Sequence, residues 1–433
     1  MNPIRFNQFL SGRSVGKTMH GAVSLAFITT VFAAAAATFS VSELPTLGGG
    51  SSSSGNSVND KGDVVGGSYN LAAQLRSTAW LAGGAPSELA VLPNAMSAEG
   101  LAVSSTGVIV GRTMLNDYSM RATLWSSVTS APIDLGTLGG PNSQASAVNA
   151  AGDAVGNAMV MGTYQAHAVM WPATNRITID LGTLPGGHYS EATAINTAGD
   201  IVGSSDDAGW VGHATLWAAP NHVPVALQTL GGIFSGAFGI NDRGDIVGYS
   251  LNATSYVWHA TLWAAPGYVP VDLGTVGGTW GAAYSINAAG DIVGYSATTG
   301  DLARHATLWS SGAAPVPVST CKSSPSLRSL SSARSERSDR RRVTSAPVAS
   351  APVSLAPVSA STAARVPIDL GTLTGGSWSE AKSINALGQI VGRGQNATLD
   401  NRAMFWKPTS VTPPPTTVPS GTHQFNGEEN GDC

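Results

Sequence analysis

The sequence predicts an all-β fold, a β-propeller of about seven four-stranded blades, with eight blades as the alternative. Two observations support this prediction. The chain repeats itself every 45 or 46 residues, and each repeat contains short segments with the alternation of a β-strand. The composition agrees, because 52 glycines and only 11% charged residues favour short strands and tight turns over amphipathic helices.

Tryptophan marks the repeat. It ends a segment such as HATLW every 45 or 46 residues, and a final copy follows 97 residues later. These structural tryptophans are Trp80, Trp125, Trp171, Trp217, Trp263, Trp309 and Trp406. A Gly-Asp pair and a DLGTLGG segment keep the same spacing, so one unit reads VDLGTLGG, AxxIN, GDIVGxS and HATLW. Seven copies are present. The second, at about 90–132, diverges most, with Ser104 in the Asn position and Val108 in the Asp position.

Each unit is expected to form about four short strands, two of them joined by a hairpin. In HATLW, His305 and Thr307 alternate with Ala306 and Leu308, as on the two faces of a strand. The sequence N-x-x-G-D between AxxIN and GDIVG is typical of a tight turn.

The phrase INAAGDIVGYS (286–296) is interpreted as one such hairpin rather than as a site. We expect Asn287 to hydrogen-bond the turn backbone and Gly290 to supply a positive φ angle. Asp291 is expected to be at most a local hydrogen-bond acceptor.

Seven four-stranded units of this length favour a propeller. A β-helix would need coils about half as long, and a trefoil would use three units. The repeated tryptophan suits the gap between twisted neighbouring sheets. The last copy ends at 402–406 without a final strand, whereas the first copy begins with an extra one at 39–49. We therefore expect the N-terminal strand to complete the last blade and close the ring.

The chain divides into five predicted parts. Residues 1–37 are a signal peptide, 38–319 hold repeats one to six, and 367–410 hold repeat seven. Between them, 320–366 form a low-complexity, disordered basic insertion with a net charge of about +6, and 411–433 form a disordered Pro/Thr-rich tail. One alternative is a functional basic loop that binds an acidic partner or is cleaved by proteases. Because the insertion is about one repeat long, an eighth repeat overwritten by a paired frameshift is the other alternative.

The N-terminus indicates export. Arg5, Arg13 and Lys17 precede an apolar run at 22–37 that ends in alanines, which suits cleavage near Ala37; an uncleaved membrane anchor is the alternative. We therefore expect a secreted, periplasmic or cell-surface protein of a bacterium, with no membrane span after cleavage. The repeats are acidic, which argues against a nucleic-acid partner. Cys321 and Cys433 form neither a disulfide framework nor a metal motif, and a single disulfide between insertion and tail or a dimer link is the alternative in an oxidising compartment.

The recurring polar residues are interpreted as structural, and no metal site is predicted. One Asp after one Gly lacks the several oxygen ligands of a calcium loop. His167, His213, His259 and His305 share one position, but equivalent residues of neighbouring blades lie too far apart to share a zinc ion. Arg121 and Arg402 replace His there, so a cation or donor at a strand end is the better account. The tripeptide Arg-Gly-Asp at 243–245 follows from the repeat.

No catalytic residue and no cofactor is predicted, since the chain has no GxSxG, no Walker loop and no catalytic Cys–His arrangement. Ser205, Asp207 and Gly209 only approach the S-x-D-x-G-x-x-W box of sialidase-type propellers. Glu191 and Glu380 occupy the same slot of copies four and seven, and nothing in the sequence brings them within the distance that a glycosidase needs.

Aromatic residues outside the repeat pattern are the candidate ligand-binding residues. They fall after LGG or just before HATLW, and local packing is the alternative role. The candidates are Trp210, Trp258, Trp280, Trp378, Tyr189 and Tyr256. Aromatic side chains on the loops of one propeller face are expected to stack on sugars, so the predicted partner is a glycan or another surface protein.

The unit LGTLGG…A-x-x-IN-x-x-GDIVG…HATLW resembles the HAF-repeat family of bacterial extracellular repeat proteins, with Thr or Val usually in the Phe position, as at His213-Ala214-Thr215. The likeness covers about 43–319 and 367–408. It implies export and a propeller-like array, and it implies no enzymatic activity.

The function expected from the sequence is that of a binding or interaction module. The alternatives are a carbohydrate-active enzyme that uses the axial channel, and a degenerate repeat protein with little function. Converging carboxylates in the channel would favour the enzyme, whereas an apolar or Ser/Thr lining would favour binding.

Overall fold

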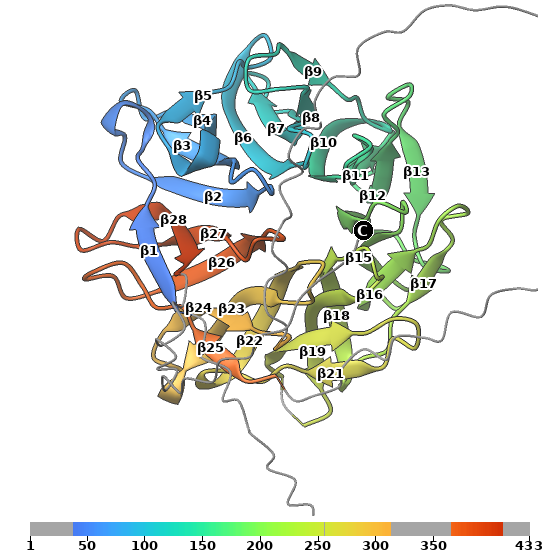
Figure 1. The fold of residues 1–433 in the computed structure, drawn as a ribbon. Helices are drawn as coiled ribbons and strands as arrows, with labels where there is room; N and C mark the ends of the chain where they lie inside the picture. Colours follow the sequence, from blue (N-terminus) through green and yellow to red (C-terminus); the bar gives the residue numbers. More distant parts are fainter. Residues whose placement is uncertain (1–37, 255, 313–364, 410–433) are drawn as a thin grey trace, which may run out of the picture. The chain divides into compact units, whose positions relative to one another are not determined.

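The computed structural model describes residues 38–254, 256–312 and 365–409, and these form a ring of seven four-stranded antiparallel sheets (Figure 1). The predicted all-β propeller is therefore confirmed, and the described residues make seven blades. The helices among them are three single 3₁₀ turns, η1 (Leu47–Gly49), η2 (Leu81–Gly83) and η3 (Thr299–Asp301). In this part of the chain, no helix is long and apolar enough to cross a membrane.

Blades 1 to 7 repeat one order of strands. The first, innermost strands are β2 (Ser53–Val58), β6 (Ala95–Val103), β10 (Gly139–Val148), β14 (Ser190–Ile195), β18 (Gly231–Ile240), β22 (Gly277–Ile286) and β26 (Ser379–Ile384). The second strands are β3 (Val64–Tyr69), β7 (Ile109–Leu115), β11 (Ala154–Val160), β15 (Ile201–Asp206), β19 (Ile246–Asn252), β23 (Ile292–Thr298) and β27 (Ile390–Gln395).

The third strands, which carry the HATLW segments, are β4 (Leu75–Trp80), β8 (Met120–Trp125), β12 (Ala166–Trp171), β16 (Gly212–Trp217), β20 (Trp258–Trp263), β24 (Arg304–Trp309) and β28 (Asn401–Pro408). The fourth, outer strands are β5 (Pro86–Glu88), β9 (Pro132–Asp134), β13 (Ile179–Gly182), β17 (Pro224–Ala226), β21 (Pro270–Asp272), β25 (Pro367–Asp369) and, for blade 7, β1 (Phe39–Glu43).

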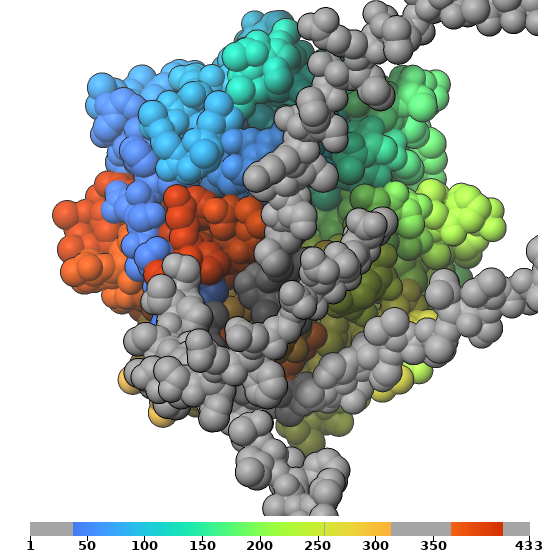
Figure 2. Space-filling view, viewed as in Figure 1, coloured from blue at the N-terminus to red at the C-terminus, as the bar shows by residue number. Residues whose placement is uncertain are grey.

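The ring closes as the sequence predicts. Strand β1 pairs antiparallel with β28, with Val41 opposite Trp406, and so supplies the missing fourth strand of blade 7. The blue N-terminal segment accordingly lies against the orange-red last blade (Figure 2). Closure covers the outer edge of β28, which would otherwise offer unpaired backbone groups to other chains.

The insertion lies inside blade 6 and not between two blades. Strands β24 and β25 flank it and pair directly, with Thr307 opposite Asp369 and Leu308 opposite Ile368. The strand at 367–369, assigned from the sequence to repeat seven, is therefore the outer strand of blade 6. The predictions for 1–37, for 320–364 and for the tail at 411–433 lie outside the described residues.

The seven repeated tryptophans lie between neighbouring blades and are fully buried. Trp263, for example, packs with Val202 and Ala214 of blade 4. Its indole N–H donates to the carbonyl of Gln228, in the link that follows the outer strand of blade 4, at 2.7 Å. The side chain thus fills the gap between blades and satisfies a buried backbone acceptor, which a phenylalanine would leave unpaired.

The N-x-x-G-D hairpin has the predicted geometry. The side-chain oxygen of Asn287 accepts the backbone N–H of Asp291 at 2.8 Å, and Gly290 has a φ angle of +90°. Asp291 does more than the sequence predicts, because one carboxylate oxygen accepts the backbone N–H of Ser311 at 2.8 Å. It therefore ties the hairpin to the link between the third and fourth strands, 20 residues along the chain.

The last glycine of GDIVG has a packing reason. A Cβ added to Gly294 would lie 2.0 Å from the carbonyl oxygen of Ala282 on the neighbouring strand. The first strand is irregular at this point, with a register shift between Ala283 and Ser285. The bulge brings the two backbones together, so only glycine fits.

The asparagines of the hairpins also bind the blades to one another around the axis. The side-chain amide of each donates to the backbone carbonyl of the equivalent residue in the next blade. The six links run from Asn59 to Ser104, Asn149 to Asn196, Asn196 to Asn241, Asn241 to Asn287, Asn287 to Asn385 and Asn385 to Asn59, at 2.8–3.4 Å. Among the described hydrogen bonds, one link of this asparagine ring around the axis is missing, between Ser104 and Asn149.

The strand order gives the ring two different faces. One, the hairpin face, carries the N-x-x-G-D hairpins and the links from third to fourth strands. Around the axis it has a depression of about 260 Å³, lined by hairpin residues that include Asn59, Asn241 and Asn385. The other, the crossover face, carries the connections from blade to blade and the loops between second and third strands. Both zones of candidate aromatic residues lie on the crossover face.

Candidate ligand-binding face

The repeated histidines are structural partners of the outer strands. His305 Nδ1 lies 2.8 Å from Asp369 of β25, and His259 lies 2.8 Å from Asp272 of β21. Where arginine replaces histidine the pair persists, as between Arg121 and Asp134 at 2.9 Å. This agrees with the account of a cation or donor at a strand end, and in the described residues no three His, Cys, Asp or Glu side chains are placed to hold a metal ion.

Blade 4 shows why the pair matters. Its outer strand has Ala226 where other blades have an acid, and His213 turns instead to Asp207 at 3.1 Å. Asp207 also accepts the backbone N–H groups of Gly209 and Val211. The sialidase-like box around Ser205, Asp207 and Gly209 therefore forms a loop that holds its own backbone.

The Arg-Gly-Asp tripeptide is part of a hairpin. The Asp245 side chain is buried, and it accepts the amide of Asn241 and the backbone N–H of Ala265. Arg243 pairs with the same carboxylate at 2.9 Å and donates to the carbonyl of Ala288 in the next blade. The tripeptide thus has the structural role that the repeat predicts.

The copies differ at four positions per blade near the crossover face, three on the first strand or just before it and one on the second. We call them the variable slots. In blade 1 they hold Ser52, Ser54, Asn56 and Gly67, and in blade 3 they hold Asn142, Gln144, Ser146 and Asn157. In blades 5, 6 and 7 they hold Phe234, Gly236, Phe238 and Tyr249; Trp280, Ala282, Tyr284 and Tyr295; and Trp378, Glu380, Lys382 and Arg393. Blades 1 and 3 therefore hold small or polar residues in these slots, whereas blades 5 to 7 hold mostly aromatic and charged ones.

The aromatic slots of blades 5 and 6 form a continuous surface, here called the aromatic wall. Ring centroids lie 5.3 Å apart for Phe238 and Tyr249, 5.2 Å for Phe238 and Tyr284, and 5.4 Å for Tyr284 and Tyr295. Trp258 adds an edge-to-face contact to Tyr249 at 4.6 Å, and Trp280 adds one to Tyr295 at 5.7 Å. The wall consists of Phe238, Tyr249, Trp258, Trp280, Tyr284 and Tyr295.

Blade 7 continues the wall with charge. Glu380 is only 1% exposed, and its carboxylate lies 2.6 Å from Arg393, 2.9 Å from Lys382 and 3.4 Å from Arg304 of blade 6. Burial alone would raise the pKa of Glu380, but Lys382, Arg393 and Arg304 outweigh it and hold that pKa below the usual value. Glu380 is therefore an ionised structural partner at neutral pH. We call Arg304, Lys382 and Arg393 the cation cluster.

The cation cluster lies against aromatic faces. The Lys382 ammonium is 4.0 Å from the centre of the Tyr284 ring. The Arg304 guanidinium is 4.7 Å from the Trp378 ring and 5.6 Å from the Tyr295 ring. Such contacts stabilise the cations and fix the orientation of the rings.

Glu191 occupies the slot of Glu380 in blade 4, in another environment. Its side chain is exposed, yet the surrounding protein withdraws enough water to raise its pKa, and Ser204 is a weak donor at 3.4 Å. Glu99 fills the same slot in blade 2, paired with Arg112 at 2.7 Å. Equivalent slots of blades 2, 4 and 7 thus each hold a carboxylate, and the three carboxylates have different partners.

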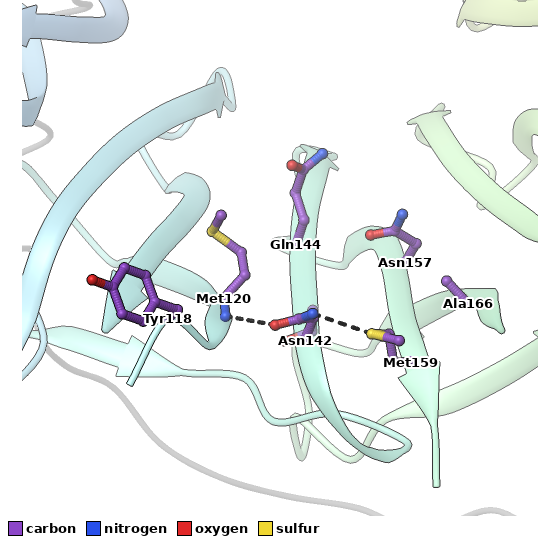
Figure 3. Close-up of a pocket in the computed structure, with 8 residues that line it drawn as sticks. Tyr118, Met120, Asn142, Gln144, Asn157, Met159 and Ala166 are labelled. Carbon is purple, nitrogen blue, oxygen red and sulfur yellow. Dashed lines mark hydrogen bonds between the residues drawn. The ribbon is translucent and has the colours of Figure 1, made fainter. Parts of the chain in front are cut away.

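Two cavities adjoin the variable slots. One, of about 240 Å³, lies between blades 2 and 3 (Figure 3), where the side chain of Asn142 joins the backbone N–H of Met120 to the sulfur of Met159. The other, of about 230 Å³, lies at blade 1 between Glu99 and Arg393. Both are smaller than typical drug-sized sites of about 300–1,000 Å³.

The six predicted ligand-binding aromatics fall into separate places. Trp258 and Trp280 belong to the aromatic wall, and Trp378 lies beside the cation cluster. Tyr189 and Trp210 form another group on blade 4, where Trp210 stacks on His188 at 3.9 Å and is 59% exposed.

Tyr256 stands apart from both groups, with 91% of its surface exposed and no ring contact among the described residues. The structure thus brings three of the six candidates together on blades 5 to 7.

Sequence reasoning missed the other members of this surface. Tyr249 and Tyr295 occupy the x position of the motif GDIVGxS, and nothing within a single copy marks that position as part of a site. The residue after the last glycine of that motif in fact varies from blade to blade, from Gly67 to Arg112 to Tyr295. A slot-by-slot alignment of the seven copies carries this signal.

No protein-family model matches the chain, and no curated protein sequence is significantly similar. Solved propellers are similar to it at low identity. TolB from Acinetobacter baumannii is 14% identical with a TM-score of 0.41, covering 57% of this chain and 61% of that one. The BP39L lectin from Burkholderia pseudomallei is 9% identical with a TM-score of 0.37, covering 87% and 99%.

A six-bladed fucose-recognising lectin from Aleuria aurantia is 11% identical with a TM-score of 0.33, covering 60% of this chain and 92% of the lectin. At such values these likenesses concern the fold, and no statement about the ligand of this chain rests on them.

Proposed function

We propose that the protein is an exported binding module that recognises a glycan on its crossover face. The observation that supports this most is the gathering of aromatic side chains in the variable slots of blades 5 to 7, where blades 1 and 3 have small polar residues. Half-buried rings such as Trp280 and Trp378 offer flat apolar faces to the C–H groups of a sugar, and neighbouring polar groups can bind its hydroxyls.

Export and the family belong to the same proposal. The basic and apolar N-terminal stretch supports secretion, or retention in the periplasm or at the cell surface, and the motif pattern supports membership of the HAF-repeat family. Secretion or display at the cell surface would expose the crossover face to extracellular glycans, and retention in the periplasm would expose it to glycans of the cell envelope.

The alternatives have less support. Glu380 is held ionised by three cations, which does not suit a general acid. The divergent second copy still forms a complete four-stranded blade, so divergence has not removed its structure.

A glycan-array screen of the full chain tests the proposal. We expect binding to a defined set of glycans, lost or at least tenfold weaker in Trp280→Ala and Trp378→Ala. Leu387→Ala, which removes an exposed apolar side chain on the hairpin face, is the matched control and should bind normally. If wild-type protein retains no glycan, or the two tryptophan variants bind as wild type does, the proposal is wrong.

A further inference from the structure

The cation cluster is an exception on an acidic molecule. The described residues carry 12 Lys and Arg against 21 Asp and Glu. Yet Arg304, Lys382 and Arg393 all surround the single carboxylate of Glu380. Three positive charges around one negative charge leave an excess of two at the end of the aromatic wall.

The three cations are accessible and have unused donors. Their side chains are 35%, 25% and 40% exposed, in the order Arg304, Lys382 and Arg393. Among the described hydrogen bonds, Arg393 donates only through Nε, to Glu380, and Arg304 donates none. Both guanidiniums therefore keep N–H groups for a planar anionic partner.

A cavity beside the cluster has room for a sugar. Arg393 lines the 230 Å³ cavity of blade 1, together with the hydroxyl-bearing Ser52, Ser54 and Tyr69. Glu99 lines its other side, where Arg112 pairs with the carboxylate at 2.7 Å. The space exists because Gly67 occupies a slot that holds a larger side chain in the other blades. A Cβ there would lie 2.9 Å from Leu75 and 3.3 Å from Glu99.

We infer that the ligand is an acidic saccharide, whose carboxylate or sulfate group pairs with Arg304, Lys382 and Arg393 while its sugar rings lie against the aromatic wall and in the blade 1 cavity. This inference rests on the proposed function and narrows it to one class of glycan. The cluster selects for negative charge, and the aromatic rings select for a saccharide over a small anion.

Calorimetric titration of the full chain with three probes tests the inference. The probes are tetragalacturonate, its full methyl ester, and a tetrasaccharide of neutral sugars that carries sulfate groups. The ester keeps the sugar rings and removes the charge. We expect at least one acidic probe to bind, more weakly as salt rises, and the ester to bind at least tenfold less tightly. Whichever acidic probe binds identifies the anionic group.

Variants locate the site. Arg304→Gln removes the cation with the longest contact to Glu380 and should weaken acidic binding about tenfold. Lys61→Gln removes one exposed charge from a hairpin on the opposite face and should leave the affinity for the acidic probe unchanged. Because the segment between β24 and β25 is also basic, binding should persist when 310–366 are replaced by the blade 5 link, 264–269.

The outcomes separate the two proposals. An ester that binds as tightly as the acid, or binding that is lost with the basic segment, overturns the inference and leaves glycan recognition to be judged by the array. If neither acidic probe binds while the array reports neutral glycans, the inference fails and the proposed function stands. If no saccharide of any charge binds, both fail.

Discussion

At the scale of single residues, the asparagine ring is the feature that most changes the interpretation of the repeat. Each Asn shapes its own hairpin through its side-chain oxygen and holds the next blade through its side-chain amide, as Asn149 does for Asp153 and Asn196. The motif recurs because every blade needs the turn and also the link. Ser104 can accept the N–H of Val108 but is too short to reach blade 3.

Ser104→Asn should therefore stabilise the protein. The new amide would complete the seventh link, to the carbonyl of Asn149, and one added buried hydrogen bond contributes about 0.5–1.5 kcal/mol. Chemical denaturation measures the change in the free energy of unfolding. Ser104→Asp, which keeps the acceptor and lacks the donor, is the control and should give no gain; equal stabilisation by both would contradict the ring interpretation.

Glu380 and Glu191 occupy the same slot in blades 7 and 4, and replacing each with Gln should change the stability of the protein in opposite directions. The pKa of Glu380 is lowered, so its stabilising effect exists above the unfolded pKa of about 4.3 and is lost as pH falls through the lowered value. Glu380→Gln should thus destabilise the protein by about 2 kcal/mol or more at pH 7, with a difference from wild type that shrinks below about pH 4.

The pKa of Glu191 is raised, so the wild-type protein loses stability as pH rises from about 4.3 through that raised value. Glu191→Gln does not ionise there and should be more stable than wild type at pH 7, with no difference below about pH 4. Denaturation curves from pH 3 to 8 check both variants. If both variants changed the free energy of unfolding at pH 7 in the same direction, the two environments would not be as described.

At the scale of elements, closure by β1 decides whether the sheets form a complete ring. Its five residues pair with β28, and Glu43 adds an ion pair to Arg402 at 2.7 Å. Without β1 the edge of β28 would be free, although Trp406 and Phe405 beneath it would keep their inner contacts. The strand is short and mostly exposed, so its contribution comes from backbone pairing more than from apolar burial.

A chain that begins at Leu44 should therefore be less stable than one that begins at Thr38. Loss of the β1 hydrogen bonds should lower the free energy of unfolding by several kcal/mol, at about 1 kcal/mol for each bond. The freed edge should also promote self-association. Thermal unfolding and size-exclusion chromatography report the two effects; a monomer of unchanged stability would mean that β1 does not close the ring.

At the scale of the whole molecule, the ring tolerates a long insertion because the insertion connects two neighbouring strands of the same sheet. Strands β24 and β25 pair in the same register as β20 and β21 of blade 5, where a link of six residues joins them. Arg365 also donates to the carbonyl of Gly290, much as Arg176 does to that of Gly152 in blade 3.

Replacing 310–366 with the blade 5 link, 264–269, should leave the fold intact. Shortening the loop lowers the entropy cost of closing it, so the free energy of unfolding should stay equal or rise by at most about 2 kcal/mol. Circular dichroism and denaturation provide the measurement. Loss of cooperative unfolding would show that the segment contributes to the propeller.

Much of this architecture follows from the sequence alone. The period of the tryptophans, the alternation within HATLW and the turn chemistry of Asn287 and Gly290 predict the blades, because each depends on residues close together in the chain. The closing strand also follows, since a missing strand at one end matches an extra one at the other.

The tertiary structure alone decided what the copies do together. Asp291 contacts Ser311 once its own blade has folded. Asn287 contacts Asn385, and Arg304 shares Glu380 with blade 7, only because the blades pack side by side in the ring. The aromatic wall and the cation cluster form because equivalent slots of consecutive blades become neighbours around the axis. A repeat pattern reports what each blade needs for its own fold, whereas the binding surface arises where different residues in the same slot meet across blades.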